Sequence, residues 1–256
     1  GGGPVSTFAW SPAEDRLAYV VGSGMLRLAI LRAGEADPLT LLAPDPAGFP
    51  GRFAWSPGGE AIAYEWRQGA EAQGLRLIAG DGLAQQPVAL YDSGFPRRSE
   101  ALLAGWTGDG RYLLFWQGEM PSASLLADGA PLYALPAGGG VPVRLSGEDG
   151  VVLYHDDFWS ISPTGSVALT VGAGRETWTN KRIVAARPAT GQPVAVTPVE
   201  QTAVSPASSP YGVAYAAAPD AGSLGGSNAA RAAVFQRRIW LAPADGSAPR
   251  QLTKDE

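Results

Sequence analysis

The pattern of apolar and polar positions along the chain predicts short β-strands. Residues 25–30 alternate long apolar side chains with short or polar ones, as expected of a strand with one buried face. Other short apolar runs, bounded by turns rich in Gly, Pro and Asp, give the same indication at 16–21, 61–64 and 112–115. No window of about 12 residues has convincing helical periodicity, and 34 glycines with 22 prolines would interrupt most helices. The pattern therefore predicts an all-β chain.

One short motif recurs through the sequence. It first appears as Phe8-Ala9-Trp10-Ser11-Pro12 and returns around Ser56, Thr107, Ser162 and, more weakly, Ser205, at intervals of 45, 51, 55 and 43 residues. A second landmark runs in phase with it, a proline just before the last strand of each unit: Pro38, Pro87, Pro142, Pro193 and Pro249. A strand-rich repeat of roughly 40–50 residues is typical of β-propeller blades.

Each repeat is predicted to form one four-stranded antiparallel blade. The five modules cover approximately 5–51, 52–100, 101–149, 150–200 and 201–256, within a single β-propeller domain over 1–256. A twisted sheet of four strands buries neither of its faces alone, whereas stacked blades cover both. We therefore expect the aromatic residue before each Ser-Pro or Thr-Gly turn, Trp10, Trp55 and Trp106, to pack between neighbouring blades.

The ends of the chain leave the blade number open. The fifth module stops at Leu252-Thr253 without the inner strand of a following blade, and no spare strand precedes the first module. The chain also begins at Gly1 without an initiator Met or a signal peptide, as expected of a processed piece. A parent propeller of six or seven blades is compatible with these features.

Composition argues against several classes of partner and site. The net charge is −5, only 17% of residues are charged and there is no basic tract, which disfavours nucleic-acid binding. No apolar run reaches the roughly 18 residues of a membrane-spanning helix. The absence of cysteine rules out disulfides and thiolate metal sites, and it fits an extracytoplasmic protein.

The repeat resembles that of TolB-type propellers, also called WD40-like or PD40 repeats. The resemblance rests on the Trp-Ser-Pro turns, the strand at 239–241, the Asp245-Gly246 turn and the closing run Arg250-Gln251-Leu252-Thr253. It covers essentially the whole chain, although the usual Asp-Gly after the Ser-Pro position occurs only as Asp109-Gly110 in the third module. The resemblance implies a blade fold and, more loosely, a bacterial periplasmic or cell-surface protein that binds other proteins. No cofactor is expected from the sequence.

Connections of variable length are predicted to gather at one end of the blades. The Ser-Pro and Gly-rich turns are short, whereas the other connections vary widely: 67–74, 117–130, 172–181 and 217–237 within modules, and 43–51, 92–101 and 147–157 between them. Variable loops on a rigid scaffold commonly carry binding, so this end is the expected binding face, centred on the connections 92–101, 117–130 and 147–157. The alternative is that the insertions are neutral.

The candidate binding residues lie in or beside these connections. Trp66, Trp116 and Trp178 fall outside the Ser-Pro motif, and each is either an interface anchor or a cap on the blade core. The remaining candidates for the surface that contacts a protein partner are Phe95, Arg97, Arg98, Glu119, Tyr154, His155, Asp156 and Asp157.

Catalytic chemistry finds little support in the sequence. His155 is the one histidine, which leaves no material for a confident catalytic triad, and Ser223 lacks the strand-turn-helix elbow of a nucleophilic serine. An acid pair drawn from Glu65, Glu119, Asp156 and Asp157, with Trp66 and Trp116 as sugar platforms, would suit a propeller glycosidase. For metals, only an all-oxygen calcium site is conceivable, and no loop has EF-hand spacing.

We therefore predict a non-enzymatic propeller that binds a protein partner through its variable-loop end. The main alternative is the propeller portion of a prolyl-oligopeptidase-like peptidase whose catalytic domain lies outside this sequence. A glycosidase is the third hypothesis.

Overall fold

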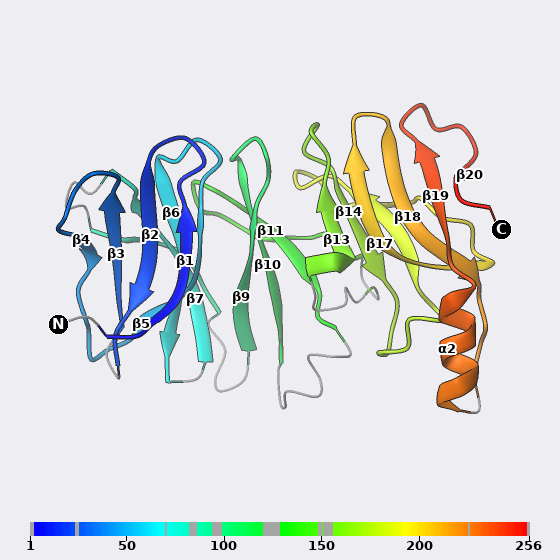
Figure 1. Cartoon of the computed structure of the whole chain (residues 1–256), viewed down its shortest axis with the longest axis horizontal. Helices are drawn as coiled ribbons and strands as arrows, with labels where there is room; N and C mark the ends of the chain where they lie inside the picture. Colours follow the sequence, from blue (N-terminus) through cyan, green and yellow to red (C-terminus); the bar gives the residue numbers. More distant parts are fainter. Residues whose placement is uncertain are drawn as a thin grey trace. The chain divides into compact units, whose positions relative to one another are not determined.

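The computed structural model confirms an all-β fold. It describes residues 3–23, 26–69, 71–81, 86–93, 99–119, 129–147, 150, 156–224 and 226–254. Over these residues the chain forms five four-stranded antiparallel sheets and one α-helix (Figure 1). Each sheet is called a blade here, numbered 1 to 5 in chain order.

The strands of blades 1 and 2 are β1 (Val5–Trp10), β2 (Arg16–Val21), β3 (Arg27–Arg32), β4 (Leu39–Leu42), β5 (Phe49–Trp55), β6 (Ala61–Gln68), β7 (Glu71–Ala79) and β8 (Val88–Asp92). Blade 3 contains β9 (Ser99–Trp106), β10 (Tyr112–Glu119), β11 (Leu132–Pro136) and β12 (Val143–Arg144). Blade 4 follows a 3₁₀ turn, η1 (Asp156–Phe158), and contains β13 (Trp159–Ile161), β14 (Val167–Val171), β15 (Arg182–Ala186) and β16 (Pro193–Ala195). Blade 5 contains β17 (Gln201–Ser209), β18 (Gly212–Pro219), helix α2 (Ser227–Phe235), β19 (Arg238–Pro243) and β20 (Arg250–Gln251).

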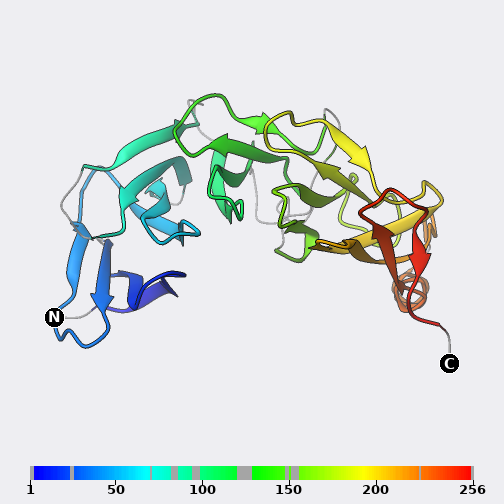
Figure 2. The ribbon, with the colours of Figure 1, turned by 90° about the horizontal axis from the view of Figure 1, so that it is seen from above.

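Every blade is a simple meander. The spatial order of strands in each sheet is the chain order, so the first and last strands of a blade are its two edges (Figure 2). By its contacts the chain divides into two compact units, residues 1–119 with 135–141, and residues 120–134 with 142–256. Unit 1 contains blades 1 and 2 with β9 and β10, and unit 2 contains blades 4 and 5, so the two are described separately.

In unit 1, blades 1 and 2 share one hydrophobic core. Blade 1 contributes Ala18, Val20, Leu28 and Ile30, and blade 2 contributes Trp55, Ile62, Tyr64 and Ile78. All of these residues are buried. The prediction that a blade is completed by packing against its neighbour is confirmed for this pair.

The tryptophan before the Ser-Pro or Thr-Gly turn links successive blades by the same hydrogen bond. The Trp55 Nε1 atom donates to the carbonyl oxygen of Ala9 at 3.1 Å, and the Trp106 Nε1 atom donates to that of Ala54 at 3.1 Å. Each acceptor residue directly precedes the motif tryptophan of the blade before, so one geometry is used twice. The expected packing between blades is confirmed for Trp55 and Trp106.

Trp10 does not pack between blades. It is 61% exposed, whereas Trp55 at the same repeat position is 8% exposed. The reason is directional, because the indole reaches back to the preceding blade, and in the described part of unit 1 blade 1 comes first. Phe8, two residues earlier on β1, is also exposed.

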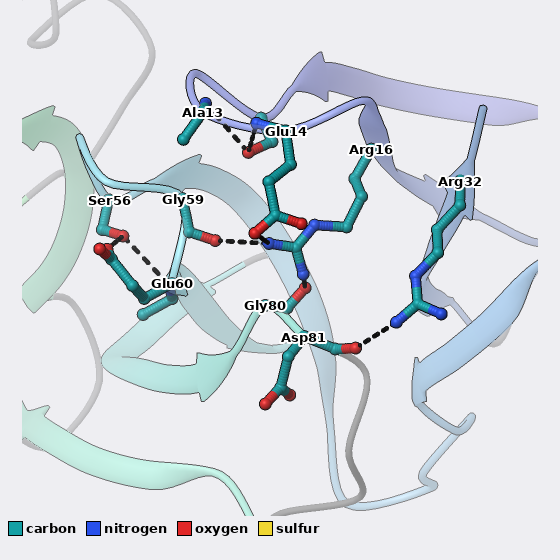
Figure 3. Close-up of polar contacts among 11 residues, drawn as sticks. Ala13, Glu14, Arg16, Arg32, Ser56, Gly59, Glu60, Gly80 and Asp81 are labelled. Atoms are coloured by element: carbon teal, nitrogen blue, oxygen red, sulfur yellow. Dashed lines mark hydrogen bonds and ion pairs between the residues drawn. The ribbon is translucent and has the colours of Figure 1, made fainter.

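Two arginines of blade 1 contact the turns of blade 2 and close the interface between these two blades at the end that carries the short turns (Figure 3). The buried Arg16 guanidinium donates to the Gly80 carbonyl and, at 3.2 Å, to that of Gly59, and it lies 5.5 Å from the centroid of the Trp55 ring. Arg32 donates to the Asp81 carbonyl at 2.8 Å. The turns of blade 2 are thereby fixed to blade 1 by charged donors on backbone acceptors.

The buried carboxylate of Glu65 satisfies backbone groups that the strand ladders leave unpaired. It accepts from the Arg52 N–H at 3.3 Å, inside the register shift of β5, and from the Leu103 N–H at 3.0 Å, beside the register shift of β9. Arg67 supplies a third contact at 2.8 Å. Burial raises the pKa of Glu65, and Arg67 opposes that shift. A carboxylate committed in this way is not the glycosidase acid that the sequence allowed.

In unit 2, blades 4 and 5 pack together through a smaller core. Ala168 and Ile183 of blade 4 contact Ala203, Tyr215 and Ala217 of blade 5. The tyrosine occupies the place that Tyr64 holds in blade 2, facing the preceding blade.

The predicted position of the fifth Ser-Pro turn was wrong by four residues. Ser205 lies inside β17, in a register shift, with a φ of 56°. The strand continues to Ser209, which pairs with Gly212 across a two-residue turn formed by Pro210 and Tyr211. Taking Ser209 as the fifth landmark changes the last interval from 43 to 47 residues.

A second correction concerns helix. α2 spans Ser227–Phe235 inside the variable connection 217–237, where no helix was predicted. Its alanine content favours helix, but nine residues are too few for a clear periodic signal, and helices this short depend on packing.

We predict that the two equivalent tryptophans differ sharply in their contribution to stability. Trp55→Ala removes a buried indole and its hydrogen bond and should lower the free energy of unfolding by about 3–5 kcal/mol. Trp10→Ala, at an exposed position, should change it by less than about 1 kcal/mol. Urea denaturation monitored by far-UV circular dichroism measures both, and equal losses would contradict the packing described above.

We also predict that Glu65→Gln destabilises the fold. An amide offers one acceptor oxygen where the carboxylate offers two, so a buried N–H or Arg67 loses its partner at a cost of about 1–3 kcal/mol. Glu35→Gln, at an exposed acid that pairs with Arg32 at 3.7 Å, is the matched control and should be nearly neutral. The same denaturation assay distinguishes the two, and a neutral Glu65→Gln would show that its contacts are dispensable.

Candidate binding surface

A candidate binding surface lies in unit 2, on the long connections of blades 4 and 5. It is formed by the loop 172–181, between β14 and β15, and by the segment 220–237, between β18 and β19. Helix α2 lies at the opposite end of blade 5 from the short β17–β18 and β19–β20 turns (Figure 1). This is the end at which the sequence predicted binding, although the predicted centre was the connections 92–101, 117–130 and 147–157, which lie in large part outside the described residues.

A single carboxylate joins the two loops. Asp220 accepts hydrogen bonds from the Thr179 hydroxyl at 2.7 Å, the Asn180 N–H at 2.7 Å and the Gly222 N–H at 2.8 Å. The hydrogen bond from Thr179, together with those from the two backbone N–H groups, lowers the pKa of Asp220. Asn180 has a φ of 52°, a backbone conformation that asparagine adopts more readily than most residues.

Backbone carbonyls of the loop 172–181, which we call the tryptophan loop, accept further hydrogen bonds from blade 5. The Thr177 carbonyl accepts from the Arg237 guanidinium at 2.8 Å and from the Thr202 hydroxyl at 3.3 Å. The Trp178 carbonyl accepts from the Ala221 N–H at 3.1 Å. Arg237 directly follows the turn after α2, so the same residue fixes the end of the helix segment and the tryptophan loop.

A buried lysine supports the loop from beneath. Lys181 is almost fully buried, and its ammonium donates to the Ala173 carbonyl at 2.8 Å. Burial lowers the pKa of Lys181, while the nearby carboxylates of Glu176 and Asp220 oppose the shift. The lysine therefore closes the loop on itself and is not presented to solvent.

Together these contacts position an apolar groove, which we call the Trp178 groove. It has a volume of about 380 Å³ and is lined by Thr177, Trp178, Ala230, Arg231, Val234 and Phe235. Ala230 and Val234 are four residues apart on α2 and so share one helical face. Phe235 is 70% exposed, and the Arg231 guanidinium lies 5.5 Å from its ring centroid. The groove thus combines two aromatic side chains, the helical face that carries Ala230 and Val234, and one cation.

The three candidate tryptophans have different environments. Trp178 is half-buried and lines the groove. Trp66 packs against the core of blades 1 and 2, with the Arg76 guanidinium 4.1 Å from its ring centroid. Trp116 is 1% exposed, inside the sheet of blade 3. Trp116 was predicted to lie beside the connection 117–130, but β10 continues to Glu119, which leaves Trp116 within the core.

The other candidates do not assemble into a site within the described residues. Asp157 is exposed on η1, and Asp156 begins that turn. Glu119 is the last residue of β10, paired with Ser99. Phe95, Arg97, Arg98, Tyr154 and His155 lie outside the described residues. Asp157 is not among the residues that line the Trp178 groove.

Several residues of the groove were missed from the sequence. Ala230, Arg231, Val234 and Phe235 belong to the unpredicted helix, and Asp220 reads locally as one more acidic loop residue. The available signal was the run from Ser227 to Phe235, which is free of Gly and Pro between two Gly-rich stretches.

The described residues contain no obvious catalytic or metal-binding cluster. No group of three or more His, Cys, Asp or Glu side chains is placed to hold a metal ion in the part of the chain that the structure describes. In the same part of the chain, no helix is long and apolar enough to cross a membrane.

Comparison with known proteins identifies the fold. No protein-family model matches the chain, and no curated protein matches it. Among solved structures, oligopeptidase B from Leishmania major matches with a TM-score of 0.59 and 14% identity over 99% of this chain and 34% of that protein. A puromycin-hydrolyzing peptidase from Mycobacterium tuberculosis matches with a TM-score of 0.58 and 15% identity over 98% of this chain and 37% of that one.

A putative TolB from Agrobacterium tumefaciens also matches, with a TM-score of 0.49 and 18% identity over 97% of this chain and 80% of that protein. The chain spans about a third of the length of the peptidases. The peptidase matches are to propeller domains, so they confirm the predicted β-propeller fold. At these identities the likeness concerns the fold alone.

We predict that removing the Asp220 carboxylate loosens the Trp178 loop without unfolding the blades. Asp220→Ala should accelerate amide hydrogen exchange severalfold at Asn180 and Gly222, because both N–H groups lose their acceptor. The pKa of Asp220 is lowered in the folded state. The stabilisation that the Asp220 carboxylate gives to the folded state is therefore present above the ordinary pKa of aspartate, and it is lost as the pH falls through the lowered pKa.

The control is Asp245→Ala, which removes an acceptor of the Ser247 N–H in a short turn of the same blade. Asp245→Ala should leave exchange at Asn180 and Gly222 unchanged. Unchanged exchange in Asp220→Ala would show that the loop is held by its other contacts.

Proposed function

We propose that this chain is a non-enzymatic, extracytoplasmic β-propeller that binds a protein partner through the loops opposite its short turns. The single observation that carries the proposal is the Trp178 groove, an apolar surface on a firmly held pair of loops. The extracytoplasmic location rests on the resemblance of the repeat to TolB-type propellers and on the lack of cysteine in all 256 residues.

The composition of the groove suits protein recognition. Tryptophan and arginine dominate binding hot spots, and Trp178 and Arg231 both line the groove. Phe235 is strongly exposed, so burying its ring against a partner would contribute favourable free energy to association. With three residue types that favour interfaces on one small surface, a protein partner is better supported than a polar metabolite.

The surface is also pre-organised. The Asp220 and Arg237 hydrogen bonds fix the loops before any partner arrives, which lowers the entropy cost of association. In contrast, no described carboxylate pair, metal cluster or nucleophile lines the groove, which supports a binding role over catalysis.

We predict that Trp178→Ala and Phe235→Ser reduce partner capture at least tenfold, with little change in melting temperature. Phe235 is largely exposed, so its replacement removes contact area from the partner and little from the fold. The immobilised protein is incubated with envelope and cytosolic fractions of its source organism, and bound proteins are identified by mass spectrometry.

Tyr211→Ser is the matched control, because it replaces an aromatic residue that is 81% exposed in the β17–β18 turn of the same blade. It should retain the partner. Loss of the partner in Tyr211→Ser, with retention in both groove variants, would place binding at the short-turn end. Capture only from the cytosolic fraction would contradict the proposed location.

A further inference from the structure

A second, larger groove lies at the other end of unit 2, between the short turns of blades 4 and 5. It has a volume of about 850 Å³, within the range of sites that hold ligands. Ser166, Ala185 and Val196 of blade 4 form one wall, and Pro210, Ala244 and Pro249 of blade 5 form the other. We call it the interblade groove. It is separate from the Trp178 groove and shares no lining residue with it.

The equivalent space between blades 1 and 2 is filled by the indole of Trp55. Trp55 pairs with Ile62 in the β5–β6 hairpin, and Ser208 pairs with Val213 at the same position of the β17–β18 hairpin. Blade 5 therefore carries a serine where blades 2 and 3 carry tryptophan. The Ser208 hydroxyl lies 2.8 Å from that of Ser160, so a short polar contact replaces the indole link between blades.

The guanidinium that closes the first interface is missing as well. The Ser11 N–H donates to the Arg16 carbonyl, and the Ser162 N–H donates to that of Ser166, which places Ser166 at the position of Arg16. In the first interface Arg16 reaches across to the turns of blade 2 (Figure 3). The serine is too short to do so, and the space remains open.

The blade 5 wall of the groove also differs from the equivalent wall in blade 2. A Cβ atom on Gly80 would lie 2.4 Å from the Trp55 ring, so the seated indole requires glycine there. The matching residue in blade 5 is Ala244, since the N–H groups of Gly80 and Ala244 donate to the equivalent carbonyls of Glu60 and Tyr211. Blade 5 can carry alanine because Ser208 does not fill this space.

The charge of the groove restricts the kinds of ligand that it can bind. Arg187 is the one charged residue among those that line it. It occupies the position of Arg32, because Arg32 follows Leu31 opposite Leu17 as Arg187 follows Ala186 opposite Val167. A guanidinium ligand would meet this like charge without the carboxylate that Glu14 supplies to Arg16 at 2.8 Å. An aromatic ring beside Arg187 would instead gain a cation–π contact, and a neighbouring carboxylate would gain an ion pair.

We propose that the interblade groove binds a peptide that presents a tryptophan side chain next to an acidic residue. The indole enters the space that Trp55 occupies in the first interface, between the apolar walls formed by Ala185, Val196 and Pro249. Serine hydroxyls of the groove accept its N–H, and Arg187 pairs with the acidic residue. This binding does not depend on the Trp178 groove.

The test uses the blocked peptide Gly-Trp-Asp-Gly-Gly and the whole chain, with affinity measured by isothermal titration calorimetry. We expect saturable binding, at least tenfold weaker for the peptide with leucine in place of tryptophan, and weaker for the peptide with lysine in place of aspartate. Arg187→Gln should remove the preference for aspartate over lysine. Trp178→Ala and Phe235→Ser should bind the peptide as the unchanged protein does.

Filling the groove from within should abolish binding. Ser208→Trp combined with Ala244→Gly restores the arrangement of blade 2, and Ser166→Arg restores that of blade 1. Each of these two variants should weaken peptide binding at least tenfold. If the double variant fails to fold, Ser166→Arg still tests the proposal. No saturable binding, equal binding of the leucine peptide, or full binding by the filled variants would overturn the proposal.

Discussion

The structure depends on one constraint: a four-stranded blade cannot bury its own faces, so each blade must be completed by a neighbour. Between blades 1 and 2 this is achieved by a shared apolar core, an indole N–H on a strand carbonyl and two arginines on the turns. The carbonyl of Ala9 lies in strand β1 and accepts the indole N–H of Trp55. A repeat that places tryptophan before each turn therefore produces both the buried area and the fixed spacing of blades.

Where the constraint is met differently, the molecule has exposed residues and grooves that are candidates for binding. Blade 1 has the tryptophan, but no blade precedes it in the described part of unit 1, and Trp10 is exposed. Blade 5 has the neighbour without the tryptophan, and the interblade groove results. On the other end of the same blades, a carboxylate and an arginine hold the loops and the helix that form the Trp178 groove. Each of these sites reflects a departure from the repeat in one module.

Polar groups inside unit 1 have a structural task. Glu65 is fully buried, yet its oxygens accept N–H groups that two strands leave unpaired at their register shifts. A carboxyl group is tolerated there because Arg67 and the two backbone donors compensate for the lost hydration. Glu65, which the sequence offered as a candidate catalytic acid, thus links β5 and β9 through buried hydrogen bonds.

The sequence by itself determined the all-β class, the four-stranded module and the packing of Trp55 and Trp106, because alternation and repeat spacing are local properties that any blade must satisfy. It also indicated Trp178 as a candidate residue from its place in a long connection. It did not determine the register of β17, the helix α2 or the burial of Trp116, because each depends on which residues a strand or helix meets in space. Ser205-Pro206 and Ser209-Pro210 are equally good turn signals locally, and only the pairing of Ser209 with Gly212 distinguishes them. The grooves, likewise, are formed by residues far apart in sequence, and only tertiary packing brings their walls together.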